Sequence, residues 1–303
     1  MSDDVPQLDA EILKRGVHRL AVQADEIKLN QGLILSRMNE ALQSTDLRDY
    51  EFKVFSQWGE DGIIQHLTKV VPIADRSFIE FGVEDFHESN CRFLLMKDNW
   101  RGFVIDGASA NIKALKKAHF YWRRRLAAAH ARITRENINA LLARSGFGPD
   151  LGLLSIDLDG ADYHVLEAIG GYRPRILICE YNALFGPHRN ITIPYDPGFA
   201  RTEAHYSNLY WGASLGAMTQ LASRKGYQLV GANSAGNNAF YVRRDLMNEG
   251  LQALTVEQAY APACFRESRD EQGRLTHLDA ADALALIAGL PVLDIDRGEI
   301  EPL

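Results

Sequence analysis

The chain has 303 residues, of which 46% are hydrophobic and 24% charged, and its formal net charge at pH 7 is −7. The excess of negative charge argues against a nucleic-acid partner. Three cysteines without CxxC spacing argue against a disulfide framework or a zinc site. The acidic, polar N-terminus predicts no secretory signal, and no apolar run approaches the roughly 20 residues of a membrane-spanning helix. We therefore expect a cytoplasmic globular protein without a transmembrane segment.

A long helix is predicted over residues 8–44, within an N-terminal segment 1–50. Its apolar residues follow heptad spacing in a narrow stripe that Gln31 alone interrupts: Leu13, Val17, Leu20, Ala24, Ile27, Ile34, Met38 and Ala41. Such a stripe is typical of a coiled coil, so we expect a homo-oligomer through this helix. The same stripe would also serve a helix packed along its own domain, and this alternative stays open.

Residues 51–248 alternate between strand and helix patterns. The predicted strands are residues 77–81, 102–105, 127–133, 151–156, 175–179, 227–231 and 238–243. Alternation of strands and helices indicates a mostly parallel sheet. The turn at residues 233–236 joins the last two strands into a hairpin, which adds one antiparallel edge strand. We therefore predict an α/β, Rossmann-like fold.

Two segments lie outside this alternation. Residues 183–208 are long, polar and rich in proline and histidine, and loops of this kind inside a compact domain are usually functional lids. Residues 249–303 read as a mostly helical, partly irregular extension to which the sequence assigns no function.

Acidic side chains follow the predicted strands where each strand ends. Ligands of an open α/β sheet bind beyond the carboxyl ends of its strands. The residues at those ends are Glu80 and Gly82, Asp106, Asp157 and Asp159, and Glu180 and Asn182. Because clustered carboxylates repel one another, we expect a positive group among them, either a cationic cofactor, a divalent metal ion, or both.

The turn after the first strand distinguishes between cofactors. A dinucleotide site uses G-x-G-x-x-G, whereas here Gly82 stands alone and Glu84 and Asp85 follow it. Two acids would repel a pyrophosphate, so NAD is disfavoured and a sulfonium nucleoside such as S-adenosylmethionine is favoured. Asp106 would then accept hydrogen bonds from the ribose. The alternative is a tight turn whose acids stabilise a helix N-terminus.

Metal and base candidates come from the same strand ends and from the lid. Oxygen ligands from neighbouring strands suit Mg²⁺, and the candidate ligands are Asp157, Glu180 and Asn182. The alternative is that residues 159–160 form a turn and that Asp162 is an N-cap. Methyl transfer to a hydroxyl needs a base, for which we expect His205 or His188, together with Asp157.

At these residues the sequence resembles the S-adenosylmethionine-dependent methyltransferases, and more narrowly the FkbM-type O-methyltransferases of polysaccharide and natural-product clusters. The matching segments are residues 56–62, 78–90, 154–167 and 178–182, with similar runs at 212–215 and 238–242. The resemblance covers roughly residues 52–245. Departures from the family pattern are the missing later glycine of the first loop and Tyr181 between two candidate metal ligands.

The resemblance implies a seven-stranded sheet whose last strand is antiparallel, and a sugar hydroxyl of a glycan or glycosylated metabolite as the acceptor. Implied cofactor contacts are Glu80, Gly82, Glu84, Asn90, Asp106 and Asp157. Implied acceptor contacts are Asp159, Tyr181, Asn182, Tyr195 and Tyr210. An NAD-linked sugar-modifying enzyme and a non-catalytic, methyltransferase-like oligomeric scaffold are the alternative functions.

Overall fold

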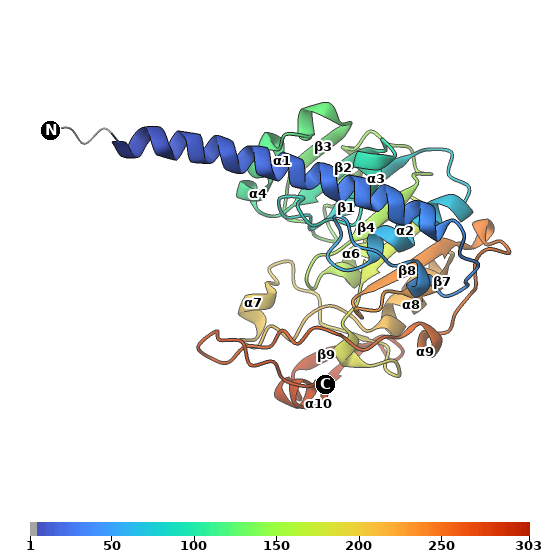
Figure 1. The fold of residues 1–303 in the computed structure, drawn as a ribbon. Coiled ribbons are helices and arrows are strands. Elements are labelled where there is room, and N and C mark those ends of the chain that lie inside the picture. The colour runs from blue at the N-terminus through green and yellow to red at the C-terminus, as the bar shows by residue number, and fades with distance from the viewer. Residues whose placement is uncertain (1–4) are drawn as a thin grey trace.

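A computed structural model describes residues 5–303, with side chains from residue 10 (Figure 1). Within these residues the central sheet has seven strands in the order β3-β2-β1-β4-β5-β8-β7. The strands are β1 (Ser77–Phe81), β2 (Arg101–Asp106), β3 (Leu126–His130), β4 (Leu153–Ile156), β5 (Ile176–Glu180), β7 (Tyr227–Ala232) and β8 (Asn238–Arg243). All neighbours pair in parallel except β8, which is antiparallel to β5 and β7. The predicted α/β, Rossmann-like sheet is confirmed, and its antiparallel strand lies beside the edge strand β7.

Helices cover both faces of the sheet, which explains why β1, β4, β5 and β8 are buried along their whole length. One face packs against α2 (Glu60–Val70), α3 (Arg92–Lys97) and α4 (Ser109–Lys117). The other packs against α5 (Ile138–Ala143), α6 (Asp162–Ala168) and α8 (Leu215–Arg224). Successive residues of one strand therefore belong to different cores, as Phe78 and Ile79 of β1 do.

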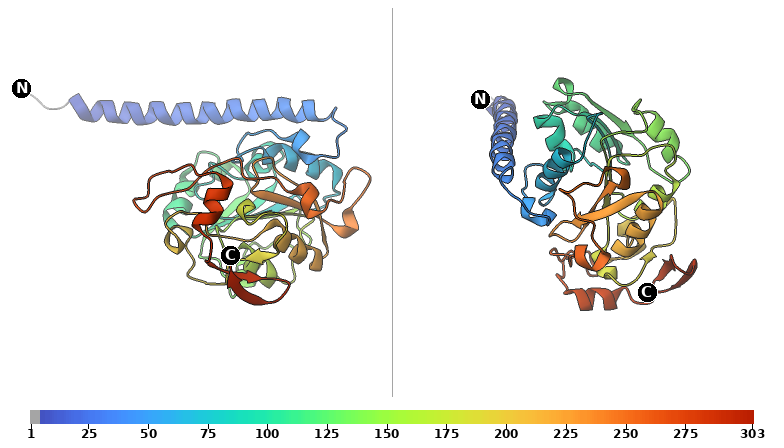
Figure 2. Two further views of the ribbon diagram at one scale, coloured as in Figure 1. Left: turned by 90° about the horizontal axis from the view of Figure 1, so that it is seen from below. Right: turned by 90° about the vertical axis from the view of Figure 1, so that its right-hand side faces the viewer.

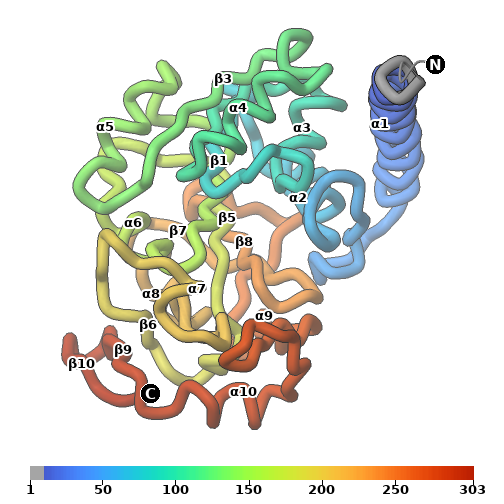
Figure 3. The backbone as a smooth tube through the Cα atoms, turned by 90° about the vertical axis from the view of Figure 1, so that its left-hand side faces the viewer, coloured from blue at the N-terminus to red at the C-terminus, as the bar shows by residue number. Residues whose placement is uncertain are grey.

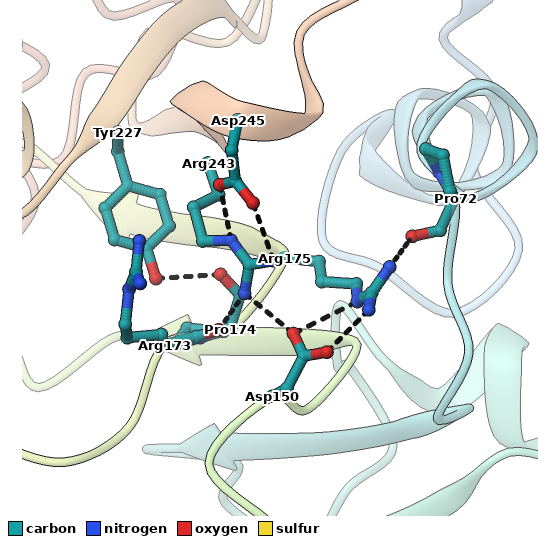
Figure 4. Close-up of polar contacts among 8 residues, drawn as sticks. All are labelled: Pro72, Asp150, Arg173, Pro174, Arg175, Tyr227, Arg243 and Asp245. Atoms are coloured by element: carbon teal, nitrogen blue, oxygen red, sulfur yellow. Dashed lines mark hydrogen bonds and ion pairs between the residues drawn. The ribbon is translucent and has the colours of Figure 1, made fainter.

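The amino ends of the central strands are held by an ion-pair network (Figure 4). Asp150 accepts hydrogen bonds from Arg175 Nη2 at 2.5 Å and from Arg243 Nη1 at 2.7 Å, so it links the chain before β4 to the start of β5 and the end of β8. These two guanidinium groups hold the pKa of Asp150 below its ordinary value. Tyr227 adds a hydrogen bond of 2.7 Å to the carbonyl of Pro174. Ion pairs therefore hold together the end of the sheet at which the parallel strands begin. The parallel strands finish at the opposite end.

The predicted mostly helical C-terminal extension is wrong. Residues 249–303 contain two short helices, α9 (Val256–Ala259) and α10 (Ala280–Leu286), and a hairpin of β9 (Pro291–Asp294) and β10 (Glu299–Pro302). The remainder is irregular chain with turns, one of them at Gly273, whose φ is +77°. Turn residues interrupt the regular spacing of apolar residues in this segment, so a long amphipathic helix cannot form.

The predicted lid, residues 183–208, is partly built into a second sheet. Its strand β6 (Ile191–Thr192) pairs with β9, giving the order β10-β9-β6, and Ile191 and Ile193 are buried in a small separate core. A short helix, α7 (Arg201–Ala204), follows. The first half of the segment is therefore anchored, and closure over a ligand stays a prediction for the part after β6.

The N-terminal helix α1 (Val5–Asn39) lies beside α2 and α3 at the margin of the molecule (Figure 3). Its N-terminal end extends past the rest of the chain (Figure 2). Among the described residues, no helix is both long enough and apolar enough to cross a membrane.

Candidate active site

A cavity of about 520 Å³ opens at the carboxyl ends of the central strands, where ligands of this type of sheet bind. Among residues 5–303, nine acidic side chains and two arginines line it. The acids are Glu80, Glu84, Glu88, Asp106, Asp157, Asp159, Glu180, Asp196 and Glu267, and the arginines are Arg132 and Arg201. The cavity is therefore strongly negative, as the acids at the strand ends predict.

The glycine turn after β1 forms the floor of this cavity. Gly82 has φ of +67°, and a Cβ built on it would come within 1.9 Å of the carbonyl oxygen of Asp157. The β1 and β4 turns thus pack backbone against backbone, which only glycine permits. Glu84 follows in the left-handed region at φ of 47°.

Asp106, at the end of β2, is fixed by bonds to its neighbours. Its Oδ1 accepts hydrogen bonds from Ala108 N at 2.7 Å and Asn111 Nδ2 at 3.1 Å, and its Oδ2 accepts one from Glu84 N at 2.8 Å. A carboxylate offers about four acceptor directions, so Oδ2 can accept one further hydrogen bond. Asp106 can therefore accept a hydrogen bond from the hydroxyl group of a ligand.

Glu80, near the end of β1, is buried and bonds to the loop that leads into α3. Its carboxylate accepts hydrogen bonds from Ser89 Oγ at 2.6 Å, Asn90 N at 2.8 Å and Cys91 N at 3.2 Å. Burial raises the pKa of Glu80 to about 7, against the opposing effect of these bonds. Asn90 in turn donates to Ser155 Oγ at 3.1 Å, which ties the loop to β4. Glu80 thus positions this wall of the cavity.

Three carboxylates meet where β4 and β5 end. One oxygen each from Asp157, Asp159 and Glu180 lies within 4.8 Å of the other two. Burial raises the pKa values of Asp157 and Glu180 well above their ordinary values, and repulsion between the neighbouring carboxylates adds to the effect. Among the described residues, the buried Oε2 of Glu180 has no hydrogen-bond donor. Asp157 and Glu180 therefore hold a proton or a cation more readily than isolated carboxylates do.

Arg201, which the sequence analysis did not select, supplies positive charge beside these acids. Its Nη1 lies 3.0 Å from Asp159 Oδ1, and its Nη2 lies 3.7 Å from Glu267 Oε2. Its guanidinium stacks 4.8 Å from the ring centre of Trp211. Because α7 lies in a segment without the residue spacing of a strand or a helix, the sequence alone does not predict that its arginine reaches the strand ends.

One wall of the cavity combines aromatic and carboxamide groups from distant parts of the chain. The rings of Trp58 and Phe265 stack, with centres 5.8 Å apart and planes at 17°. Asn237 and Asn238, at the start of β8, complete this wall. Within the described chain, Trp58 Nε1 and Asn238 Oδ1 are buried without a hydrogen-bond partner. Phe265 and Glu267 place the C-terminal extension in the site, although the sequence assigned it no function.

The two histidines predicted as bases lie away from the cavity. The Nδ1 of His205 bonds to Ser207 Oγ at 2.7 Å, and partial burial lowers the pKa of His205. His188 does not contact the cavity either, and among the described residues no histidine lines it. The chain turns between β6 and α7 so that Arg201, not a histidine, faces the acids. This arrangement does not support either histidine as the base, and both stay predictions.

Three other predicted contacts are also corrected. Asn182 is not a metal ligand here, because its Nδ2 donates to the carbonyls of Leu209 and Trp211 and its Oδ1 caps the following turn. Tyr181 is fully buried in the core, since successive strand residues point to opposite sides. Tyr210 is buried in the small core of the second sheet and donates to the carbonyl of Pro291.

The remaining predicted residues all line the one cavity. They are Glu80, Gly82, Glu84, Asn90, Asp106, Asp157, Asp159, Glu180 and Tyr195. Tyr195 donates to Glu136 Oε2 at 2.5 Å, and Arg132 donates to the carbonyl of Phe199 at 2.7 Å, so the chain after β6 is bonded to the end of β3. The individual roles of the nine predicted residues that line the cavity stay predictions.

No family model matches the sequence, and no curated protein matches it. Among solved structures, the N-terminal domain of EvdMO1 with SAH bound is 8% identical, with a TM-score of 0.40 over 62% of this chain and 80% of that chain. The precorrin-6y C5,15-methyltransferase of Geobacter metallireducens GS-15 is 11% identical, with a TM-score of 0.38 over 63% of this chain and 90% of that chain. A chain of the complex between the Haloferax volcanii Trm112 methyltransferase activator and a methyltransferase is 14% identical, with a TM-score of 0.33 over 56% and 70%. Likeness this remote assigns no activity.

Proposed function

We propose that the chain is an S-adenosylmethionine-dependent methyltransferase. The observation that carries the proposal is the acidic cavity at the carboxyl edge of the sheet, with a single-glycine turn on its floor. A pyrophosphate would be repelled there, whereas a sulfonium cation would be stabilised. The resemblance of residues 52–245 to this enzyme family supports the same reading. S-adenosylmethionine, when bound, supplies a methyl group activated by its positive sulfur.

The residues present fit such a cofactor. Asp106 retains one acceptor direction for a ribose hydroxyl, and Gly82 keeps the floor free of side chains. Glu80 acts as a positioning residue, because its carboxylate fixes the loop that carries Asn90. Asp157 adds negative charge beside them.

We further propose a sugar hydroxyl as the acceptor, with one of the paired carboxylates as its base. The Trp58–Phe265 stack offers an aromatic face for the C–H face of a sugar ring, and Asn237 and Asn238 offer hydrogen bonds to hydroxyls. The raised pKa values of Asp157 and Glu180 bring a carboxylate closer to the range in which a base works at neutral pH. These two carboxylates take the role for which the sequence predicts a histidine.

A divalent metal is a secondary part of this proposal. Asp157, Asp159 and Glu180 have the hard oxygen donors that Mg²⁺ prefers, with one oxygen of each within 4.8 Å of the other two, and such an ion would favour loss of the acceptor's proton. Arg201 competes for the same charge through Asp159. Titrating MgCl₂ into the protein by calorimetry tests the site. Saturable Mg²⁺ binding that becomes tighter in Arg201→Ala would support the metal site. No binding heat at millimolar MgCl₂ would exclude it.

The cofactor is tested by calorimetric titration of S-adenosylmethionine into the full chain. We expect saturable binding that Asp106→Ala weakens about 10- to 100-fold, since hydrogen bonds to a carboxylate contribute about 1.5–3 kcal/mol. Asp85→Ala is the matched control, because Asp85 lies in the same loop but does not line the cavity. Equal affinity in the two variants would refute the ribose role of Asp106.

A parallel titration of NAD separates the alternatives. An NAD-linked sugar-modifying enzyme would bind NAD in place of S-adenosylmethionine, and the acidic lining argues against it. A non-catalytic scaffold would bind neither, and a pocket without a ligand gains nothing from repelling carboxylates.

A further inference from the structure

The apolar stripe that heptad spacing defines on α1 is exposed to solvent along the helix. We call it the seam. Its large residues expose about three-fifths of their surface: Leu13 67%, Val17 58%, Leu20 66%, Ile27 59%, Ile34 60% and Met38 64%. A continuous row of large apolar side chains is rarely left in water on a soluble protein, so a row of this length indicates a partner.

The opposite side of α1 is already occupied by the globular part of the chain. Gly32 lies so close to Phe93 and Val54 that an added Cβ would come within 2.6 Å of both side chains. Asp25 receives a hydrogen bond of 2.5 Å from the buried Arg92. These contacts fix the rotation of α1, so the seam cannot turn inward. The alternative that the stripe serves the helix's own domain is thereby excluded.

We propose that the seam pairs with the seam of a second copy of this chain, in a parallel, two-stranded coiled coil. Heptad spacing is the pattern by which two helices keep one face in contact over several turns. Gln31 is the one polar residue in the seam. In a parallel, in-register pair it would meet Gln31 of the second copy, amide against amide, and a single polar residue in such a place specifies register.

The area is sufficient for a stable contact. Each large seam side chain exposes on the order of 100 Å² of apolar surface, so two copies would bury on the order of 1,200 Å². A specific interface needs roughly 1,000 Å² or more in total. Because each globular part lies on the far side of its own helix, two copies can flank a central helix pair without clashing.

The charges of α1 favour a helix partner over a membrane surface. Its sequence carries five lysines and arginines and four aspartates and glutamates, so it is almost neutral. A helix that binds anionic lipid has a strongly basic polar face.

Light scattering on the full chain tests the proposal. We expect about twice the chain mass of 33.9 kDa at micromolar concentrations, and the single mass for the double variant Leu20→Glu with Ile27→Glu. Ile300→Glu is the control, since Ile300 is 64% exposed but lies on β10. A wild-type protein of single mass, or a double variant that keeps the wild-type mass, would overturn the proposal. So would a single-mass protein that sediments with anionic vesicles.

Cross-linking tests the orientation. In a Cys264→Ser background the two remaining native cysteines are buried, so a new cysteine is the only exposed thiol within the described chain. We expect Gln31→Cys to form a disulfide-linked dimer under mild oxidation, and Arg15→Cys, on the opposite side of the helix, to form none. A dimer that links through residue 15 as readily as through residue 31 would refute the parallel, in-register pair.

Discussion

Several residues around the cavity hold backbone conformations that side chains usually avoid. Glu84, Phe86 and Asp159 have φ values of 47°, 67° and 52°. Such conformations cost about 1–3 kcal/mol each and persist only where the surroundings enforce them. Phe86 is enforced by complete burial. The strain is concentrated in the two turns whose residues line the acidic cavity, which is where a fixed geometry serves a ligand.

Gly82 gives the sharpest test of close packing in these turns. Gly82→Ala should lower the free energy of unfolding by about 1–3 kcal/mol more than Gly146→Ala does. Gly146 has nearly the same φ, +68° against +67°, but open space around its Cβ position, so it carries the conformational cost alone. Denaturant titration of both variants measures the difference. Equal losses would mean that the β1 and β4 turns can move apart at little cost.

The paired carboxylates Asp157 and Glu180 predict a pH dependence of cation binding. Burial, with repulsion between neighbouring carboxylates, raises both pKa values, so the free protein holds a proton there at a pH where isolated carboxylates have lost theirs. A bound cation lowers these pKa values and expels the proton. The affinity for S-adenosylmethionine should therefore rise with pH until both carboxylates of the free protein have lost their protons.

Calorimetry in two buffers of different ionisation enthalpy measures that proton directly. We expect proton release on binding, and Glu180→Gln should remove most of it. Binding without proton exchange would show that the cofactor does not sense the pair.

Among single residues, the sequence predicted the acidic residues of the cavity well and the other residues around them poorly. Asp106, Asp157 and Glu180 were found because parallel strands end at one edge, whatever the loops do. Arg201 and Phe265 were missed, and His205 does not line the cavity, because the directions of these side chains depend on irregular chain without a regular spacing of apolar residues. Tyr181 could have been excluded, since alternation along β5 turns it away from its neighbours.

Among the elements, α1 depends on one buried charge. Arg92 is 1% exposed, and its guanidinium lies between the rings of Phe55 and Phe120, at 4.2 and 4.6 Å from their centres. Asp25 of α1 is its acidic partner. The helix is therefore joined to the sheet domain by an ion pair that is shielded from water.

Asp25→Ala should destabilise the protein by about 3–5 kcal/mol, because it leaves a buried guanidinium without its counter-charge. Glu11→Ala is the control: Glu11 also pairs with an arginine of α1, but both side chains are exposed. Thermal and denaturant unfolding measure both variants. A small loss for Asp25→Ala would show that water reaches Arg92 when α1 is released.

The bounds of some strands of the sheet follow closely from the sequence, whereas the N-terminal helix was expected over residues 8–44 and spans Val5–Asn39. The first strand and the last strand of the sheet have the predicted bounds. The third was expected to reach residue 133 and ends at His130, where the chain leaves its pairing with β2. The second sheet was missed, because β6 is a two-residue strand whose partner lies about a hundred residues further along the chain.

Across the whole molecule, stability and binding are placed at opposite edges of one sheet. The amino edge satisfies its charges through Asp150, Arg175 and Arg243. The carboxyl edge keeps repelling acids and polar atoms without partners. A cationic ligand should therefore raise the melting temperature by more than an uncharged ligand of the same size, because it also reduces the repulsion between these acids.

The stack of Trp58 on Phe265 has a consequence for how the protein folds. Paired strands of the central sheet lie at most 75 residues apart in the chain, as Phe78 and Leu153 do, whereas this contact joins Trp58 to Phe265, 207 residues apart. Closing so long a loop is slow relative to local pairing. Refolding chains should therefore regain their circular dichroism first and their ability to bind an acceptor last, passing through a species that has its sheet but not yet its pocket wall.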